Sequence, residues 1–201
     1  LGQLYKSEYQ DLCRGLSLYS RGYLEGIIAA QSQINGGYII DEMLTADTLR
    51  LVNSDFLKAS KGRFSVTGRE LSYTLAKETT GRQRYTALAL LSDRCNVNVY
   101  SNDTDGRLEK ASFCGYVDYY DKMPAVFRSS KINLNISLCT IQTGIPLRVL
   151  DIMACGGFVL TNMQPELMEY FIPGEDVAVY EDMKDMIAKV QFSLEHEELR
   201  K

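Results

Sequence analysis

The sequence has a single histidine, His196, and none of its five cysteines forms a C-x-x-C pair. A structural zinc site takes four Cys or His ligands at short spacings, so no metal site is expected. A histidine-based catalytic triad is not expected either, because His196 lies in a charged C-terminal tail. The odd number of cysteines, mostly in apolar surroundings, predicts free buried thiols in a reducing cytoplasm.

Strong positive charge and long apolar runs are also absent. The net charge is −4, with acidic and basic residues spread along the chain, which argues against nucleic acid as a partner. A small anionic ligand is still compatible with this balance. No apolar stretch approaches the length of a transmembrane segment, about 20 residues, and no signal-peptide pattern is visible. The chain begins with Leu1 rather than Met, as a fragment of a longer protein would.

Residues 1–80 are predicted to form an α-helical segment. The chain of 201 residues is 45% hydrophobic, enough for one ordinary domain or two small ones. Helices are expected over residues 22–33 and 45–53. Capping boxes, in which Ser or Thr is followed three positions later by Glu or Gln, predict helix starts at Ser7, Thr67 and Thr80.

Residues 81–201 alternate strand and helix patterns. Strands are expected in 95–101, 131–137, 157–162 and 176–180, a strand or loop in 111–117, and helices in 119–130, 145–155, 164–171 and 181–194. This alternation predicts an α/β fold, a Rossmann-like parallel sheet with helices on both faces. Right-handed crossovers bring the carboxyl ends of such strands to one edge, where ligands bind.

The helix predicted from Ile145 is apolar almost all round, yet it carries Arg148 and Asp151 one turn apart. Thr143 or Gly144 is the expected N-cap, with Pro146 in the first turn. The N-terminus of such a helix attracts a phosphate. Gly144 would allow close approach of a ligand to the backbone, and the Arg148 guanidinium could make a forked contact with the phosphate.

A simpler interpretation of Arg148 and Asp151 is a surface ion pair, contributing about 0.3–0.5 kcal/mol. Two features of the sequence weigh against it. The rest of the helix is apolar, and Gly156-Gly157 leads directly into a buried strand. Charges on a buried helix require partners, so we favour a phosphate and sugar-hydroxyl site.

The pattern G-x-P-x-R-x-x-D-x-x-A-x-G-G runs from Gly144 to Gly157, and P-E-L…F-x-x-G-E-D…Y follows it. With these motifs, residues 82–201 resemble the C-terminal, donor-binding half of a GT-B glycosyltransferase of the group-one type, similar to the CgeB family. The resemblance implies transfer of a sugar from a nucleotide-diphosphate donor, UDP or GDP type, to an unknown acceptor. It implies no metal and no other cofactor.

The resemblance also implies roles for single residues. Asp151 matches the acidic residue that holds the ribose, and Arg148 and Gly144 match a region near the diphosphate. Gly115 and Tyr116 match a segment near the nucleobase, although packing of Tyr116 under a loop is an alternative.

Two further side chains are expected at the edge of the sheet where the carboxyl ends of the strands meet. Glu166 follows a strand and could touch the donor, or could belong to a solvated helix face. Ser137 ends another strand near the ligand edge. Classical retaining members carry a glutamate at the position of Thr143, so the sequence does not predict the stereochemistry of transfer.

The segment ahead of residue 81 is too short and too helical to be a complete acceptor domain. We therefore expect this chain alone to bind nucleotide but to turn over little, since an inverting enzyme's general base would lie on the missing half. One alternative is a non-catalytic nucleotide-sugar-binding or interaction domain. A receiver domain is disfavoured, because the strand ending at Ser137 lacks a phospho-accepting aspartate.

Overall fold

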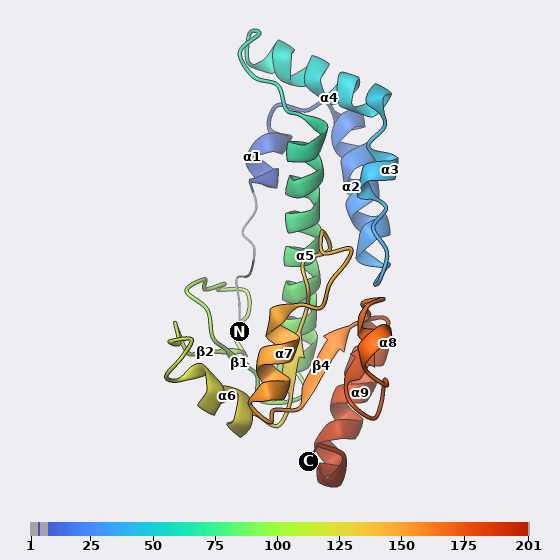
Figure 1. Ribbon diagram of the computed structural model, residues 1–201. Coiled ribbons are helices and arrows are strands. Elements are labelled where there is room, and N and C mark those ends of the chain that lie inside the picture. Colours follow the sequence, from blue (N-terminus) through green and yellow to red (C-terminus); the bar gives the residue numbers. More distant parts are fainter. Residues whose placement is uncertain (1–3, 5–7, 201) are drawn as a thin grey trace. The chain divides into compact units, whose positions relative to one another are not determined.

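The computed structural model describes Leu4 and residues 8–200. It divides into two compact units, one made of residues 1–4, 83–137 and 141–201, the other of 5–82 and 138–140. The long helix α5 (Gly68–Ser92), green in Figure 1, contributes to both. None of the described helices is long and apolar enough to cross a membrane.

In the part of the helical unit that the structure describes, four helices precede α5. These are α1 (Tyr9–Cys13), α2 (Leu18–Ser32), α3 (Ile40–Met43) and α4 (Ala46–Ala59). Their shared core consists of buried side chains such as Leu24, Ile28 and Leu75. Helices were expected in 22–33 and 45–53, and the structure confirms both. The first capping box starts at Ser7, which lies outside the described residues.

The capping box at Thr67 is confirmed at the start of α5. The backbone N–H of Thr67 donates to Glu70 Oε2 at 2.7 Å, and the N–H of Glu70 donates to Thr67 Oγ1 at 3.2 Å. The box predicted at Thr80 is wrong, because α5 continues through it without a break. Thr80 is fully buried, and its hydroxyl oxygen accepts the backbone N–H of Cys139 at 3.1 Å.

The second unit has the predicted α/β, Rossmann-like fold with parallel strands. Strands β1 (Asn98–Val99) and β2 (Ser112–Phe113) form one pair. Strands β3 (Asn133–Asn135), β4 (Val159–Asn162) and β5 (Ala178–Tyr180) form a second parallel sheet in that order. The expectation of one sheet is therefore corrected: β1 and β3 are not paired, and the Arg84 guanidinium instead donates to the carbonyl of Ile136, just beyond β3.

Helices cover both faces of the three-stranded sheet, as predicted. Adjacent residues of β4 point to opposite sides, so Val159 packs in one core cluster and Leu160 in another. The Val159 side is covered by α6 (Met123–Ser129), α7 (Leu147–Ala154) and α8 (Leu167–Tyr170). The Leu160 side is covered by the end of α5 and by α9 (Met183–Glu195), which is followed by a 3-10 turn, Glu197–Arg200.

All five cysteines are free thiols, but their burial differs from the prediction. Cys114 is exposed, and the others are partly buried. Burial raises the pKa of Cys139 to about 11, and its sulfur lies 3.5 Å from the carbonyl oxygen of Ala76. The thiolate is the nucleophile in alkylation, so a raised pKa slows the reaction.

We therefore expect iodoacetamide at pH 8 to modify Cys114 first and Cys139 last. Peptide mass spectrometry over a time course measures the two rates. Cys114→Ser should abolish the fast phase and leave the slow phases unchanged. Equal rates at Cys114 and Cys139 in the native chain would contradict the burial described here.

Candidate functional site

Helix α7 begins later than the sequence suggested. Its N-cap is Pro146, and the first helical bond runs from the N–H of Val149 to the carbonyl of Pro146 at 2.9 Å. The predicted caps, Thr143 and Gly144, are wrong, because they lie in an exposed turn before the helix. Gly144 adopts a φ of 89°, in the left-handed region that favours glycine, while an added Cβ would meet no atom within 4 Å.

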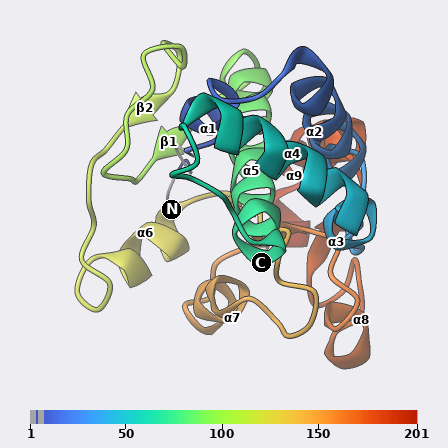
Figure 2. The same cartoon turned by 90° about the horizontal axis from the view of Figure 1, so that it is seen from above.

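Arg148 is half-buried in the first turn of α7, close to α6. Its Nη1 donates to the sulfur of Met123 at 2.7 Å, and its guanidinium lies 5.6 Å from the ring centroid of Phe127. Figure 2 shows α6 and α7 side by side. The surface ion pair between Arg148 and Asp151 is not formed, and Arg148 has no ion-pair partner among the described residues. A partly desolvated cation without a carboxylate retains the capacity to bind an anion.

Asp151, one turn further along α7, is held by Tyr119. The Tyr119 hydroxyl donates to Asp151 Oδ1 at 2.7 Å, and this hydrogen bond to a carboxylate raises the pKa of Tyr119. The sequence did not predict the bond between Tyr119 and Asp151. The bond occupies one carboxylate oxygen and leaves the other available as an acceptor.

The loop before α6 carries the two residues expected near a nucleobase. Gly115 has a φ of 72°, and the Tyr116 side chain is 69% exposed, so Tyr116 does not pack under the loop. The next residue, Val117, is buried in the same cluster as Met123 and Val149. The loop is thereby anchored beside α6 and α7, although no hydrogen bond joins Tyr116 to Arg148 or Asp151.

Ser137 is buried in a polar network at the carboxyl ends of β3 and β4. Its backbone N–H donates to Asn162 Oδ1 at 2.9 Å, and its hydroxyl oxygen accepts from Asn135 Nδ2 at 3.0 Å. Asn135 also donates to the Thr161 hydroxyl at 3.0 Å. The network aligns two strand ends at the edge. Asn162 and Thr161 were missed, although polar residues that end an apolar strand were a usable signal.

Glu166 lies half-buried ahead of α8. Its Oε2 is enclosed and has no hydrogen-bond partner. A buried carboxylate oxygen without a donor is costly, so this atom has an unsatisfied acceptor site. No hydrogen bond or ion pair joins Glu166 to Arg148 or Asp151. Glu169, on α8, is exposed.

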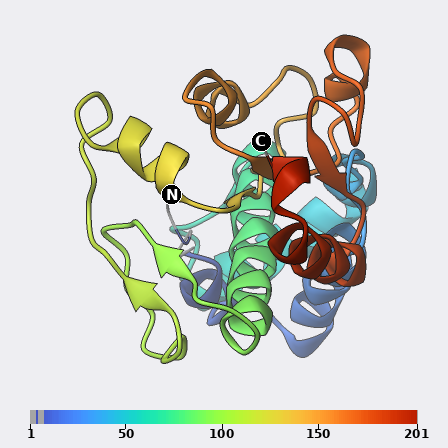
Figure 3. The same cartoon turned by 90° about the horizontal axis from the view of Figure 1, so that it is seen from below.

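A cavity of about 590 Å³ lies between β1 and β3, which belong to different sheets. Figure 3 shows the β1–β2 pair as yellow-green strands. Arg148, Tyr100 and Asn135 line this cavity, and its described lining contains no aspartate or glutamate. Arg148 thus lines this cavity, whereas Gly144, Asp151 and Glu166 do not.

The comparisons with known proteins agree with this architecture. A family model described as glycosyl transferase-like matches residues 57–201. No curated protein and no solved structure matches the chain. The matched segment begins within α4, includes all five strands and contains every candidate site residue described above. The chain therefore belongs to the glycosyl transferase-like family.

Proposed function

We propose that this chain binds the nucleotide-diphosphate sugar donor of a glycosyltransferase, with the diphosphate at the first turn of α7. One observation carries the proposal: Arg148 is a half-buried cation that contacts a thioether sulfur and an aromatic ring. A thioether sulfur is a weak acceptor, so a phosphate would replace it at little cost. Family membership supplies the general chemistry, glycosyl transfer.

The diphosphate is expected to meet two kinds of positive charge. The first-turn N–H groups of α7 carry the positive end of the helix dipole. The Arg148 guanidinium adds a forked, charge-assisted contact. The left-handed turn at Gly144 holds the preceding loop in an exposed position, where a ligand can approach the backbone.

The remaining contacts follow from what each side chain offers. Asp151 has an acceptor oxygen for the ribose hydroxyls. Tyr116 presents a largely exposed ring to the nucleobase. Glu166 is proposed to accept from a sugar hydroxyl, which requires its enclosed Oε2 to turn towards the ligand. Ser137 contributes by fixing the strand edge through its backbone N–H and its hydroxyl oxygen.

We further propose a metal-independent GT-B enzyme, in which a separate acceptor-binding half supplies the general base. The CgeB-like group is the expected relative, and this chain alone is expected to show little turnover.

A non-catalytic nucleotide-sugar binder is the second candidate. It is favoured by Thr143, which stands where classical retaining members carry a glutamate. Turnover of donor by the full-length protein separates the two.

The ribose contact is tested with nucleotides that lack the two ring hydroxyls. We expect the chain to bind UDP or GDP at least about 10-fold more tightly than the 2′,3′-dideoxy analogue, since hydrogen bonds to a charged group contribute about 1.5–3 kcal/mol. Asp151→Asn should reduce this ratio towards one. Calorimetric titration measures the affinities of the wild type and of Asp151→Asn for the ribonucleotide and for its dideoxy analogue.

The matched control is Glu169→Gln, which removes the charge of an exposed carboxylate on α8. It should preserve the preference for the ribonucleotide. If Asp151→Asn also preserves the preference, Asp151 does not hold the ribose.

A further inference from the structure

The connection between α4 and α5 carries a surface that the proposed function does not use. We name residues 57–64 the α4–α5 tip. It contains three basic residues, Lys58, Lys61 and Arg63, and no acidic residue, in a chain of net charge −4. None of the three forms an ion pair with any residue that the structure describes. Two large apolar side chains lie among them, Leu57 at 44% and Phe64 at 48% exposed.

The α4–α5 tip is an ordered turn. The N–H of Gly62 donates to the carbonyl of Leu57 at 2.7 Å, which closes the end of α4 in a Schellman-type turn. The Ser60 hydroxyl accepts the N–H groups of Arg63 at 3.1 Å and Phe64 at 2.9 Å. The Phe64 ring packs edge-on against buried Phe56, with ring centroids 5.1 Å apart. The backbone that carries the basic side chains is thus ordered, and the Phe64 ring is held in place.

Lys61 occupies a backbone conformation that favours glycine. Its φ is 54°, and among the described residues it is the one non-glycine with a positive φ. Helices that end in this way usually carry glycine at the left-handed position, because a side chain there is strained. Strain kept in a structure points to a function for the residue that bears it. The function available to an exposed lysine here is its charge.

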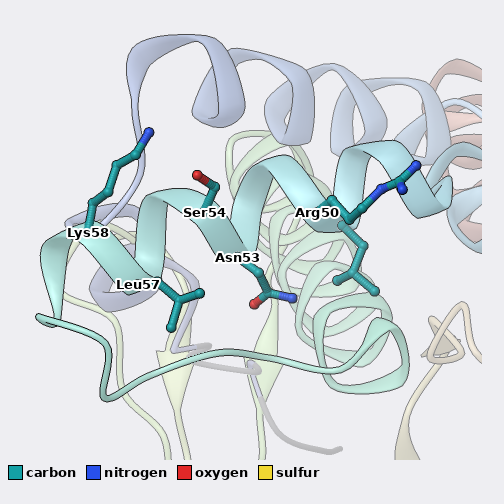
Figure 4. Close-up of a pocket in the computed structure, with 6 residues that line it drawn as sticks. Arg50, Asn53, Ser54, Leu57 and Lys58 are labelled. Atoms are coloured by element: carbon teal, nitrogen blue, oxygen red, sulfur yellow. The ribbon is translucent and has the colours of Figure 1, made fainter.

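An open groove of about 640 Å³ adjoins the tip on α4. It is lined by Leu49, Arg50, Asn53, Ser54, Leu57 and Lys58. Figure 4 shows Leu57 and Lys58 projecting from the last turn of α4. Nearby acids are engaged within the unit, since Asp47 pairs with Arg50, and Asp55 accepts the Ser17 hydroxyl at 2.6 Å. The groove and the tip form one basic and apolar surface.

We propose that the α4–α5 tip docks this protein on an anionic phospholipid bilayer. Leu57 and Phe64 enter the interfacial layer, while the three cations contact lipid phosphates. Single-stranded nucleic acid fits less well, because it binds on several open aromatic faces and Phe64 is a single ring packed against Phe56. Docking of this kind places the chain at a membrane surface without a spanning helix.

Vesicle co-sedimentation of the full chain tests the proposal. We expect binding to vesicles of 30% phosphatidylglycerol in phosphatidylcholine, and at least 10-fold weaker binding to pure phosphatidylcholine. Charge reversal by Lys58→Glu, Lys61→Glu and Arg63→Glu together should abolish binding. The matched control reverses three exposed cations elsewhere, Lys122→Glu, Arg128→Glu and Lys184→Glu, and should retain it.

Two further variants separate docking from folding. Lys61→Gly relieves the backbone strain, so the chain should be at least as stable, yet its vesicle binding should weaken. Leu57→Ser with Phe64→Ser should weaken binding at unchanged charge. Equal binding of the wild type and the charge-reversed variant would overturn the proposal. So would tighter binding to a single-stranded oligonucleotide than to the anionic vesicles.

Discussion

Arg148→Ala is expected to weaken binding of UDP or GDP by about 10- to 100-fold, measured by calorimetry. The estimate follows from about 1.5–3 kcal/mol for hydrogen bonds to a charged group. Arg148→Lys should recover part of the loss, because an ammonium provides charge but not the planar fork of a guanidinium. The variant also loses the contacts with Met123 and Phe127, so a thermal melt should accompany each titration.

Arg128→Ala is the matched control for this experiment. Arg128 lies exposed on α6, the same helix that Arg148 contacts, and its loss removes an equal charge. We expect nucleotide affinity to change less than 2-fold in this variant, in line with a surface substitution. Unchanged affinity in Arg148→Ala, or an equal loss in both variants, would remove Arg148 from the site.

Gly157→Ala is expected to lower the free energy of unfolding of the chain by about 1–3 kcal/mol, the usual cost of overpacking. An added Cβ would lie 2.7 Å from the carbonyl oxygen of Phe127 and 2.9 Å from Asn133 Nδ2. Neither atom can move freely, because Asn133 Nδ2 donates to the carbonyls of Phe127 at 2.9 Å and Phe158 at 3.1 Å. Denaturant unfolding followed by circular dichroism measures the change.

The control for Gly157 is Gly106→Ala. A Cβ at Gly106 would meet no atom within 4 Å, so its stability should stay within about 0.5 kcal/mol of the wild type. If Gly157→Ala unfolds at the same denaturant concentration as Gly106→Ala, the close approach of α7, α6 and β3 described here is incorrect.

Much of the fold follows from local patterns in the sequence. An alternating apolar pattern predicted β3 and a fully apolar run predicted β4, while β5 falls in the strand expected over 176–180. The capping boxes at Thr67 and Thr80 show that a local pattern does not always identify the start of a helix. Thr67 follows a non-helical segment, so its box starts a helix. Residues before Thr80 are already helical and supply the acceptors for the following N–H groups.

The candidate site depends on contacts that local patterns cannot supply. Tyr119 and Asp151 are 32 positions apart, and Arg148 and Met123 are 25 positions apart. The periodicity of the sequence placed Arg148 and Asp151 on one helix. It could not show that Asp151 contacts a residue just before α6, or that Arg148 contacts a residue within α6. The sequence also could not show that β1 and β3 are unpaired, because both segments have ordinary strand patterns.

A crystal structure of the chain with UDP or GDP tests the central claim most directly. The account predicts the diphosphate within hydrogen-bond distance of the first-turn N–H groups of α7 and of the Arg148 guanidinium, with the ribose hydroxyls on Asp151. A nucleotide bound elsewhere, with Arg148 still on Met123 and Asp151 still held by Tyr119, would contradict it.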